Sequence, residues 1–470
     1  PRTRPSSQIA REDTQGLADA DLVELFDSQL KSRQLDLMAR KKRQENKVFY
    51  TIGSSGHEGN ALLGRLSRPT DPAFLHYRSG AFMAERYRHQ PSLNFIKDTC
   101  LSFAASKNDP SSGGRHKVWG HPDLWVLPQT STIASQLPKA LGMALGIESA
   151  SGIPHTLPIP GDSLVLCSFG DASFNHATAQ TALNAAAWTR HQNLRCPIVF
   201  VCEDNGWGIS VPTPTDYIEQ SVKHRHGIDY FKADGLDLEK GHASVQEALR
   251  VARSKRRPVF LHLKTVRLMG HAGTDFEIEY RNELELVASE RQDPLLRSAE
   301  LVIDRGLMDG AAILSRYKAL HQECLSEADV ADQLPRLTSR SEIMAPLGPL
   351  SNLQAIERAA SLDGFESERQ AIWGGSLPED DRPTHMAFMI NYALRDLLIK
   401  YPQAIVFGED VAKKGGVYTI TKKLWSLFGR RRVFNTLLDE TTILGLAQGY
   451  GSLGYLPVPE IQYLAYIHNA

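Results

Sequence analysis

The feature that most constrains the fold is a series of short apolar runs that alternate with stretches of helical periodicity. Runs of strand length and strand composition occur at 164–169, 198–201 and 259–263. An Ala-rich helical stretch at about 175–188 separates the first two runs, and apolar residues at three- and four-residue spacing predict a helix over 130–147. Strands and helices that alternate at these lengths predict an α/β fold, with doubly wound parallel sheets and helices on both faces.

The alternation weakens and then resumes. Over 340–384 prolines interleave with acidic residues, which is typical of an interdomain linker with some helix inside it. A helical stretch at 386–398 and a strand-like run at 404–407 follow. We therefore expect an N-terminal helical segment over 1–48, a first α/β domain over 49–339, a linker over 340–384, and the start of a second α/β domain over 385–470.

Charge and cysteine content exclude several classes of protein. The chain has 53 Lys and Arg against 54 Asp and Glu, and this balance argues against a protein that coats nucleic acid or membranes. We interpret the basic run at 40–43 as the solvated face of a helix. The 5 cysteines include no CxxC pair, so a disulfide scaffold and a zinc ribbon are poor interpretations. Reduced thiols in a cytoplasmic protein are the expectation.

Two polar residues follow two of the predicted strands. Asp171 comes just after the first buried run, and Asn205 just after the second. In open parallel sheets, ligands bind in the crevice outside the carboxyl ends of the strands. A carboxylate and an amide oxygen placed there are suitable ligands for Mg²⁺. The alternative is that Asp171 only caps the helix that follows it.

Further patches accompany these two residues and carry a resemblance to a known family. They lie at 49–58, 76–80, 113–116, 129–136 and 270–275. Over roughly residues 20–335, their order and spacing resemble the α part of the thiamine-diphosphate-dependent 2-oxo acid dehydrogenases, the decarboxylating components of the pyruvate and branched-chain complexes.

The resemblance continues after the predicted linker. The segments 406–411, 415–418, 432–440 and 459–463 resemble the start of the family's β part, so the chain resembles a fusion of the two parts. Because the β part of the family is longer, we expect this chain to be a fragment of a longer polypeptide. The catalytic histidine of the β part would then lie beyond Ala470.

The resemblance implies that the chain binds thiamine diphosphate through Mg²⁺. The implied metal ligands are Asp171, Asn205 and the backbone carbonyl of Trp207. The residues implied to contact the cofactor are Tyr77, Arg78, Ser131, Ile133, Asp171, Ala172, Ser173, Asn205, Gln462 and Tyr466. At two positions the chain departs from the family pattern, because Ala172 replaces a glycine and Asp204 replaces an asparagine. We expect the charge of Asp204 to affect metal affinity without removing the site.

Several of these residues also have simpler interpretations. Arg78 would grip the diphosphate, for which a guanidinium is well suited, or it is an ordinary surface or ion-paired arginine. Ile133 would be the apolar wedge that bends the cofactor, while its periodicity alone places it in the core stripe of a helix. A potassium site like that of branched-chain members is implied at Thr130, Thr132, Ser135 and Gln136, where helix capping is the alternative.

The resemblance also implies two catalytic residues. His271 matches the active-site histidine of the α part, and Glu440 matches the β-part glutamate that hydrogen-bonds the aminopyrimidine. A structural histidine and an acid that complements a helix dipole are the respective alternatives. Ala272 occupies the position of a regulatory phosphoserine in the animal enzymes, so that switch cannot operate here.

The implied activity is oxidative decarboxylation of a 2-oxo acid, with reductive acylation of the lipoyl group of a partner acyltransferase. Tyr50 and Tyr77 match substrate-facing positions, and no basic residue is evident beside them. We therefore expect a branched-chain or related apolar 2-oxo acid in preference to pyruvate or acetoin, and we disfavour 2-oxoglutarate. A transketolase-type ketol transferase and a degenerate scaffold subunit are the competing interpretations.

The resemblance also bears on assembly. In the family, the α and β parts belong to different subunits. We therefore expect a homodimer of the fused chain, with each composite site built from both protomers, and no nucleic-acid or membrane partner.

Overall fold

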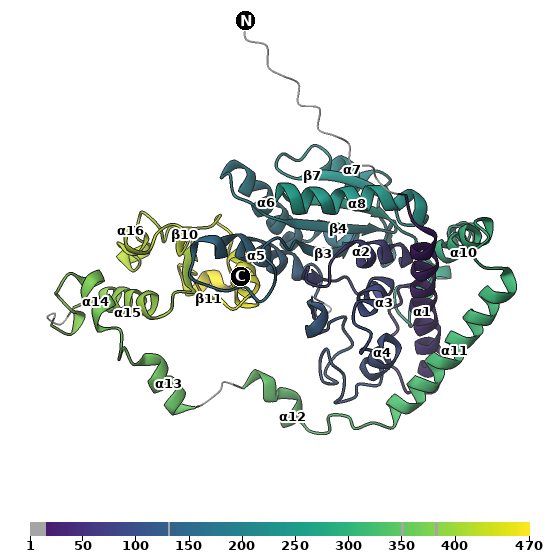
Figure 1. Ribbon diagram of the computed structural model, residues 1–470, viewed down its shortest axis with the longest axis horizontal. Helices are drawn as coiled ribbons and strands as arrows, with labels where there is room; N and C mark the ends of the chain where they lie inside the picture. The colour runs from purple at the N-terminus through teal and green to yellow at the C-terminus, as the bar shows by residue number, and fades with distance from the viewer. Residues whose placement is uncertain (1–15, 130–131, 349–351, 381–383) are drawn as a thin grey trace, which may run out of the picture.

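The computed structural model describes residues 16–129, 132–348, 352–380 and 384–470. Its centre is a six-stranded sheet with the order β2-β1-β3-β4-β8-β7, in which every neighbouring pair is parallel (Figure 1). The strands are β1 (Ala73–Phe74), β2 (Val126–Leu127), β3 (Val165–Gly170), β4 (Ile198–Asp204), β7 (Asp229–Asp234) and β8 (Val259–Lys264). The three predicted strands are confirmed as β3, β4 and β8.

Helices cover both faces of this sheet, as the alternating side chains of β4 show. Val199 and Val201 belong to one apolar cluster, and Ile198 and Phe200 belong to the other. The first cluster includes residues of α1 (Asp19–Gln44), α2 (Ala61–Leu66), α3 (Gly80–Arg88), α4 (Phe95–Phe103), α8 (Leu238–Lys255), α10 (Pro294–Asp304) and α11 (Gly310–Asp332). The second includes α5 (Gln136–Ser149), α6 (Ala177–His191) and α7 (Tyr217–Val222). The predicted doubly wound α/β architecture is therefore confirmed.

The helix predicted over 130–147 begins later than expected. It is α5, and it starts at Gln136 because Ala134 has φ 63°, a left-handed conformation that cannot continue a helix. Ile133 consequently lies outside the helix and is 40% exposed, so its interpretation as a core residue is wrong. Its exposed side chain is therefore accessible to a ligand.

The interpretation of the basic run at 40–43 as a solvated face is also wrong. Lys42 is only 5% exposed, and its Nζ donates to Glu45 and Asp329 at 3.0 and 2.6 Å. The reason is that α1 does not lie on the surface with one free side, since α3 and α11 pack against it. Lys42 instead joins α1 to α11 through Asp329, while Lys41 of the same run is exposed.

A second, smaller sheet follows a series of short helices. The chain passes through α9 (Glu283–Glu290), α12 (Arg340–Met344), α13 (Leu353–Ala360) and α14 (Glu366–Trp373) before it reaches α15 (Met386–Lys400). The second sheet has the order β10-β9-β11 and is parallel throughout. Its remaining elements are β9 (Ala404–Gly408), α16 (Leu424–Phe428), β10 (Val433–Asn435), α17 (Glu440–Gly451) and β11 (Leu456–Pro459). In Figure 1, α12 and α13 form an arc below the two sheets.

Helices α5 and α17 join the two sheets by packing at backbone distance. A Cβ atom on Gly142 would lie 2.5 Å from the backbone oxygen of Leu446, and one on Gly449 would lie 2.2 Å from the backbone oxygen of Lys139. Further along, Gly146 faces Leu453, so residue numbers rise together and the helices run parallel. Their first residues, Gln136 and Glu440, therefore lie at the same end of the pair.

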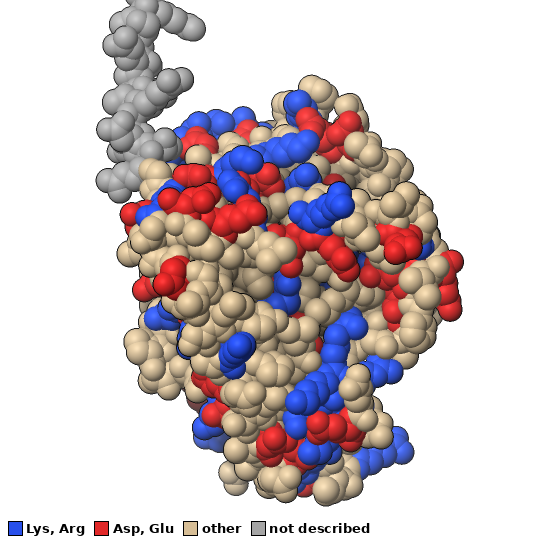
Figure 2. All heavy atoms as spheres, turned by 90° about the vertical axis from the view of Figure 1, so that its right-hand side faces the viewer, with Lys and Arg blue, Asp and Glu red and all other residues tan. Residues whose placement is uncertain are grey.

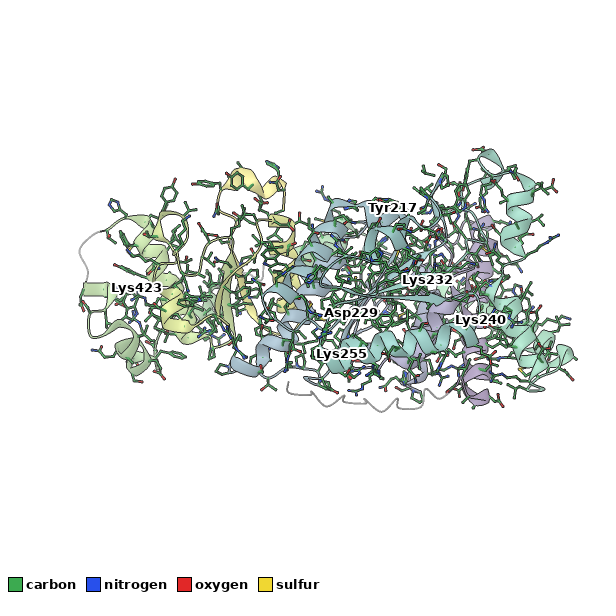
Figure 3. All side chains as sticks on the ribbon, turned by 90° about the horizontal axis from the view of Figure 1, so that it is seen from above. Tyr217, Asp229, Lys232, Lys240, Lys255 and Lys423 are labelled. Carbon is green, nitrogen blue, oxygen red and sulfur yellow. The ribbon has the colours of Figure 1, made fainter. Side chains whose placement is uncertain are left out.

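Charges of both signs are mixed on the face that Figure 2 shows. Figure 2 shows lysine, arginine, aspartate and glutamate side chains intermixed over one face of the molecule. In Figure 3, Lys240 and Lys255 lie at the large sheet, while Lys423 lies at the far end, in the part that carries the small sheet. Within the described ranges, no helix combines the length and the apolar character needed to cross a membrane. All 5 cysteines are buried and unpaired.

Candidate functional site

The carboxyl ends of β3 and β4 bring Asp171 and Asn205 together. Gly170 pairs with Glu203 in the strand register, so the next residues of both strands leave the sheet at the same edge. Asp171 is 1% exposed, and its carboxylate accepts a hydrogen bond from the Thr213 hydroxyl. It makes no side-chain cap bond to the turn that follows, so the capping alternative is wrong. Burial is the main reason that the pKa of Asp171 rises to about 6.

A chain of hydrogen bonds holds the amide of Asn205 in one orientation. The Trp207 backbone N–H donates to Asn205 Oδ1 at 3.0 Å, which leaves Nδ2 to donate to His57 Nε2 at 3.0 Å. His57 must then carry its proton on Nδ1, which donates to Glu203 Oε2 at 2.7 Å. Asn60 donates to the same carboxylate oxygen at 3.3 Å. His57 and Glu203 are thus positioning residues, and neither was predicted individually from the sequence.

The two departures from the family pattern have local explanations. Asp204 is turned away from the pair, because its carboxylate accepts from the Gly206 N–H at 3.0 Å and contacts His262 Nε2 at 2.8 Å. Its charge still contributes to the raised pKa of Asp171. Ala172 packs against the hairpin of β5 (Trp207–Gly208) and β6 (Val211–Pro212), where a Cβ atom on Gly208 would lie 2.7 Å from that of Ala172.

Arg78 and His271 lie in direct contact beside this edge. Arg78 is 2% exposed, donates from Nη1 to the Gly53 carbonyl at 2.5 Å, and donates from Nη2 to His271 Nδ1 at 3.3 Å. His271 Nδ1 is therefore an acceptor and its proton is on Nε2. Burial, together with the charges of Arg78 and Arg267, lowers the pKa of His271 to about 4. The interpretation of Arg78 as a surface arginine is wrong.

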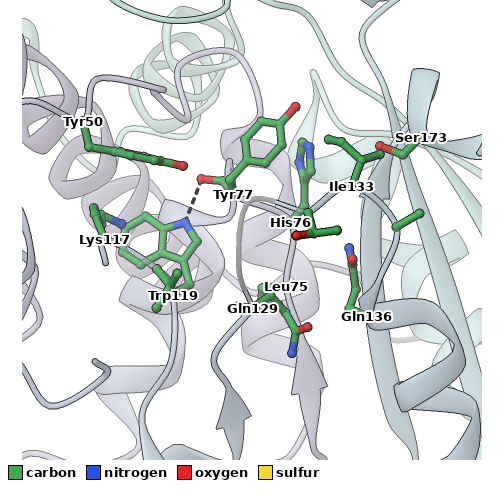
Figure 4. A pocket seen from close by; sticks show the side chains of 13 residues that line it. Tyr50, Leu75, His76, Tyr77, Lys117, Trp119, Gln129, Ile133, Gln136 and Ser173 are labelled. Atoms are coloured by element: carbon green, nitrogen blue, oxygen red, sulfur yellow. Dashed lines mark hydrogen bonds between the residues drawn. The ribbon is translucent and has the colours of Figure 1, made fainter. Parts of the chain in front are cut away.

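A pocket next to these groups gathers several of the predicted residues (Figure 4). Its lining includes Tyr50, Tyr77, Ile133, Thr132, Gln136 and Ser173, together with Leu75, His76, Lys117, Val118, Trp119, Gln129 and Ala134. Of the implied potassium ligands, Ser135 adjoins this lining, and its buried hydroxyl has no partner among the described residues. Thr130 and Ser131 lie outside the described residues. Sequence reasoning missed His76, Lys117 and Trp119.

The residues at this edge fit Mg²⁺ and a diphosphate. Asp171 and Asn205 supply oxygen ligands, and Arg78 supplies a buried cation. Both ring nitrogens of His76 are buried without a partner in the described part of the chain, which leaves them available to a ligand in the pocket. One ligand atom each from His57, His76 and Glu203 lies within 4.8 Å of the others, but both nitrogens of His57 are already used.

The part of the chain that forms the small sheet carries two acidic residues of interest, Glu440 and Glu460. Glu440 is the first residue of α17, where its charge also complements the helix dipole. Glu460 follows β11 and is half-buried, and burial beside Asp410 and Glu409 raises its pKa to about 7. Gln462 is half-buried and Tyr466 is 41% exposed. Neither belongs to the pocket lining described above.

Two parallel sheets connected by a helical segment, with polar groups at the strand ends of the first, define an α/β protein that has a candidate ligand site at that sheet edge. Residues 27–339 match the family model described as "Dehydrogenase E1 component", and residues 383–470 match "Transketolase, pyrimidine binding domain". The chain belongs to the dehydrogenase E1 component family, with a pyrimidine-binding domain in the same chain.

Individual relatives agree with this membership. The mitochondrial 2-oxoisovalerate dehydrogenase subunit alpha of Mus musculus is 26% identical over 300 residues, which cover 62% of this chain and 63% of that protein. The 2-oxoisovalerate dehydrogenase subunit alpha of Bacillus subtilis is 26% identical over 328 residues, which cover 67% of this chain and 93% of that protein. The chain thus spans about 63% of the length of the mouse relative.

Proposed function

We propose that this chain catalyses the thiamine-diphosphate-dependent oxidative decarboxylation of a 2-oxo acid and passes the acyl group to the lipoyl group of a partner acyltransferase. One observation carries the proposal. Gln136 at the start of α5 lines the same pocket as Ser173, which follows Asp171 by two residues, and Glu440 begins the helix that packs parallel to α5. A single cofactor can then meet the metal ligands at one end and Glu440 at the other.

Each end of the cofactor has its own set of residues. Asp171, Asn205 and the Trp207 carbonyl hold Mg²⁺, and Arg78 binds the diphosphate. Ser131, Ile133 and Glu440 bind the aminopyrimidine, with Ala172, Ser173, Gln462 and Tyr466 nearby. When bound, thiamine diphosphate supplies the electron sink that loss of carbon dioxide requires. Thr130, Thr132, Ser135 and Gln136 form a potassium site in this proposal.

The protein moves and holds the protons. His271 is neutral near pH 7 because its pKa is about 4, and its proton is on Nε2. It can therefore donate a hydrogen bond from Nε2 to an oxygen that gains negative charge during the transfer, while it keeps the proton. Tyr77, whose ring centroid lies 6.1 Å from that of His271, borders the same space and limits the approach of water.

The substrate is a 2-oxo acid, and the finer proposal is a branched-chain one. The relatives are named for 2-oxoisovalerate, and the aromatic walls at Tyr50 and Tyr77 suit an apolar chain. Pyruvate and acetoin are the alternatives. We further infer a homodimer and, from 5 unpaired cysteines, a cytoplasmic location.

The test is a panel of 2-oxo acids with the full-length polypeptide, Mg²⁺, thiamine diphosphate and a lipoyl domain. We expect acylation of the lipoyl group and release of carbon dioxide. Ketol transfer between sugar phosphates without lipoyl acylation would favour the transketolase-type alternative. Calorimetry that detects no Mg²⁺-dependent binding of thiamine diphosphate would favour the scaffold alternative.

A further inference from the structure

Lys117 is a buried lysine surrounded by aromatic rings. Only 8% of Lys117 is exposed to solvent. The Nζ atom lies 3.2 Å from the ring centroid of Trp119, 5.2 Å from that of Phe103 and 5.9 Å from that of Tyr50. Aromatic faces attract a cation, so these rings hold the ammonium in place.

This ammonium lacks a counter-ion. Among the residues that the structure describes, no carboxylate forms an ion pair with Lys117, and only Asp36 and Asp109 act on its charge from further away. The acids that act on it from further away are committed elsewhere. Asp36 accepts from the backbone N–H groups of Ser54 and Ser55, and Asp109 accepts from those of Ser111 and Ser112. Burial lowers the pKa of Lys117 to about 7, which reflects the cost of an unpaired charge.

Lys117 also lies in the pocket, at the end away from the groups assigned to the cofactor. In Figure 4, Lys117 lies beside Tyr50 and Trp119 on one side, while Ile133 and Ser173 lie on the other. Tyr77 stands between the two groups. A substrate whose reacting carbon faces Ile133 and Ser173 therefore extends its far end toward Lys117.

We propose that Lys117 binds a carboxylate at the far end of the substrate, so that the preferred substrate class is the 2-oxo dicarboxylic acids. The inference rests on the proposed oxidative decarboxylation of a 2-oxo acid, and it replaces the branched-chain substrate favoured by the named relatives with a dicarboxylic one. A distal carboxylate supplies the missing counter-ion, and the rings around Lys117 exclude the water that would weaken the pair. A branched-chain acid ends in methyl groups and leaves the ammonium without a partner. The expectation that the pocket has no basic residue is corrected by this lysine.

The test compares two substrates of matched shape on the full-length holoenzyme. 2-Oxoglutarate has a distal carboxylate, and 5-methyl-2-oxohexanoate replaces it with an isopropyl group. We expect the wild-type kcat/KM to favour 2-oxoglutarate. The Lys117→Met variant should lose about 10- to 100-fold on that substrate alone, the range expected for a hydrogen bond to a charged group. Lys117→Arg should retain part of the preference.

The matched control is Lys107→Met, since Lys107 is an exposed lysine that pairs with Glu342. It should change neither kcat/KM. An equal loss on both substrates in Lys117→Met would overturn the proposal, because Lys117 would then bind a group common to all 2-oxo acids. A wild-type preference for the isopropyl substrate that Lys117→Met leaves unchanged would overturn it as well.

A second measurement separates this proposal from the proposed function. Glutarate has two carboxylates and no keto group, so its binding can be followed by calorimetry without turnover. Weaker glutarate binding in Lys117→Met than in Lys107→Met supports the carboxylate site even if no 2-oxo acid is decarboxylated. Equal binding in both variants refutes it even if the enzyme is active.

Discussion

The carboxyl edge of the six-stranded sheet and the start of α17 hold their polar groups in different ways. At the sheet edge, Asp171, Asn205 and Arg78 all have hydrogen-bond partners from the same part of the chain. Glu440 depends instead on the packing of α17 against α5, where glycines let two backbones touch. One half of the candidate site is organised by a local network, and the other half is positioned by contact between helices α5 and α17.

The largest expected effect comes from breaking the sheet-edge half. Asp171→Ala should abolish the Mg²⁺-dependent binding of thiamine diphosphate and leave the fold intact, because it removes a proposed metal ligand without removing apolar packing. Calorimetry on the full-length polypeptide measures the binding. Asp162→Ala is the control, since Asp162 is an exposed carboxylate that precedes β3 and pairs with Arg68. Unchanged cofactor affinity in Asp171→Ala would show that the metal assignment is wrong.

The second prediction concerns the activity of mixed dimers, which tests whether the two halves of each candidate site come from the same chain. Because α5 packs on α17 of the same chain, we expect a mixed dimer of Asp171→Ala and Glu440→Ala chains to stay inactive, since every site keeps one defect. The sequence favoured sites built across protomers, in which case one site of a mixed dimer has no defect. Recovery of lipoyl acylation in a verified mixed dimer would therefore support the cross-chain arrangement.

A smaller effect comes from disturbing the contact between helices α5 and α17. Gly142→Ala should destabilise the protein by about 1–3 kcal/mol, the usual cost of overpacking, because the new methyl group meets the backbone of Leu446. Chemical denaturation measures the change. Gly161→Ala is the control, since a Cβ atom at Gly161 meets nothing within 4 Å. Equal stabilities of the two variants would mean that α5 and α17 are not in backbone contact.

The smallest effect concerns Lys117, which has no ion-pair partner of its own among the described residues. Its folded-state pKa of about 7 lies below the ordinary lysine value of 10.5, so the unfolded chain binds more protons between these pH values. The loss of folding stability caused by burying the Lys117 charge is therefore greatest below about pH 7. This loss decreases as the pH rises toward 10.5.

The stability gained in Lys117→Met should accordingly shrink by about 1 kcal/mol from pH 7.5 to 8.5, as linkage predicts for such a shift. Denaturation midpoints of wild type and variant at each pH measure the difference, in which other titrating groups cancel. Lys107→Met, an exposed lysine, should show no such trend. A stability difference that does not vary with pH would mean that Lys117 is not desolvated in the folded state.

The strands that the sequence predicted and those it missed differ in one physical respect. Residues of β3, β4 and β8 are buried on both faces, so they form continuous apolar runs that are visible in one dimension. The edge strand β7 (Asp229–Asp234) contains charged residues and is half-exposed, and β1 has two residues, so neither produces such a run.

The sequence by itself determined the α/β class, the two sheets, and Asp171 and Asn205 as candidate ligands, because strand burial and strand-end position are local properties of the chain. Only the tertiary structure decided that His57 and Glu203 orient Asn205, and that Lys117 lies among Tyr50, Phe103 and Trp119. In the sequence, Lys117 belongs to an ordinary polar loop. Its environment is made by residues far apart along the chain, which burial brings together and no local pattern records.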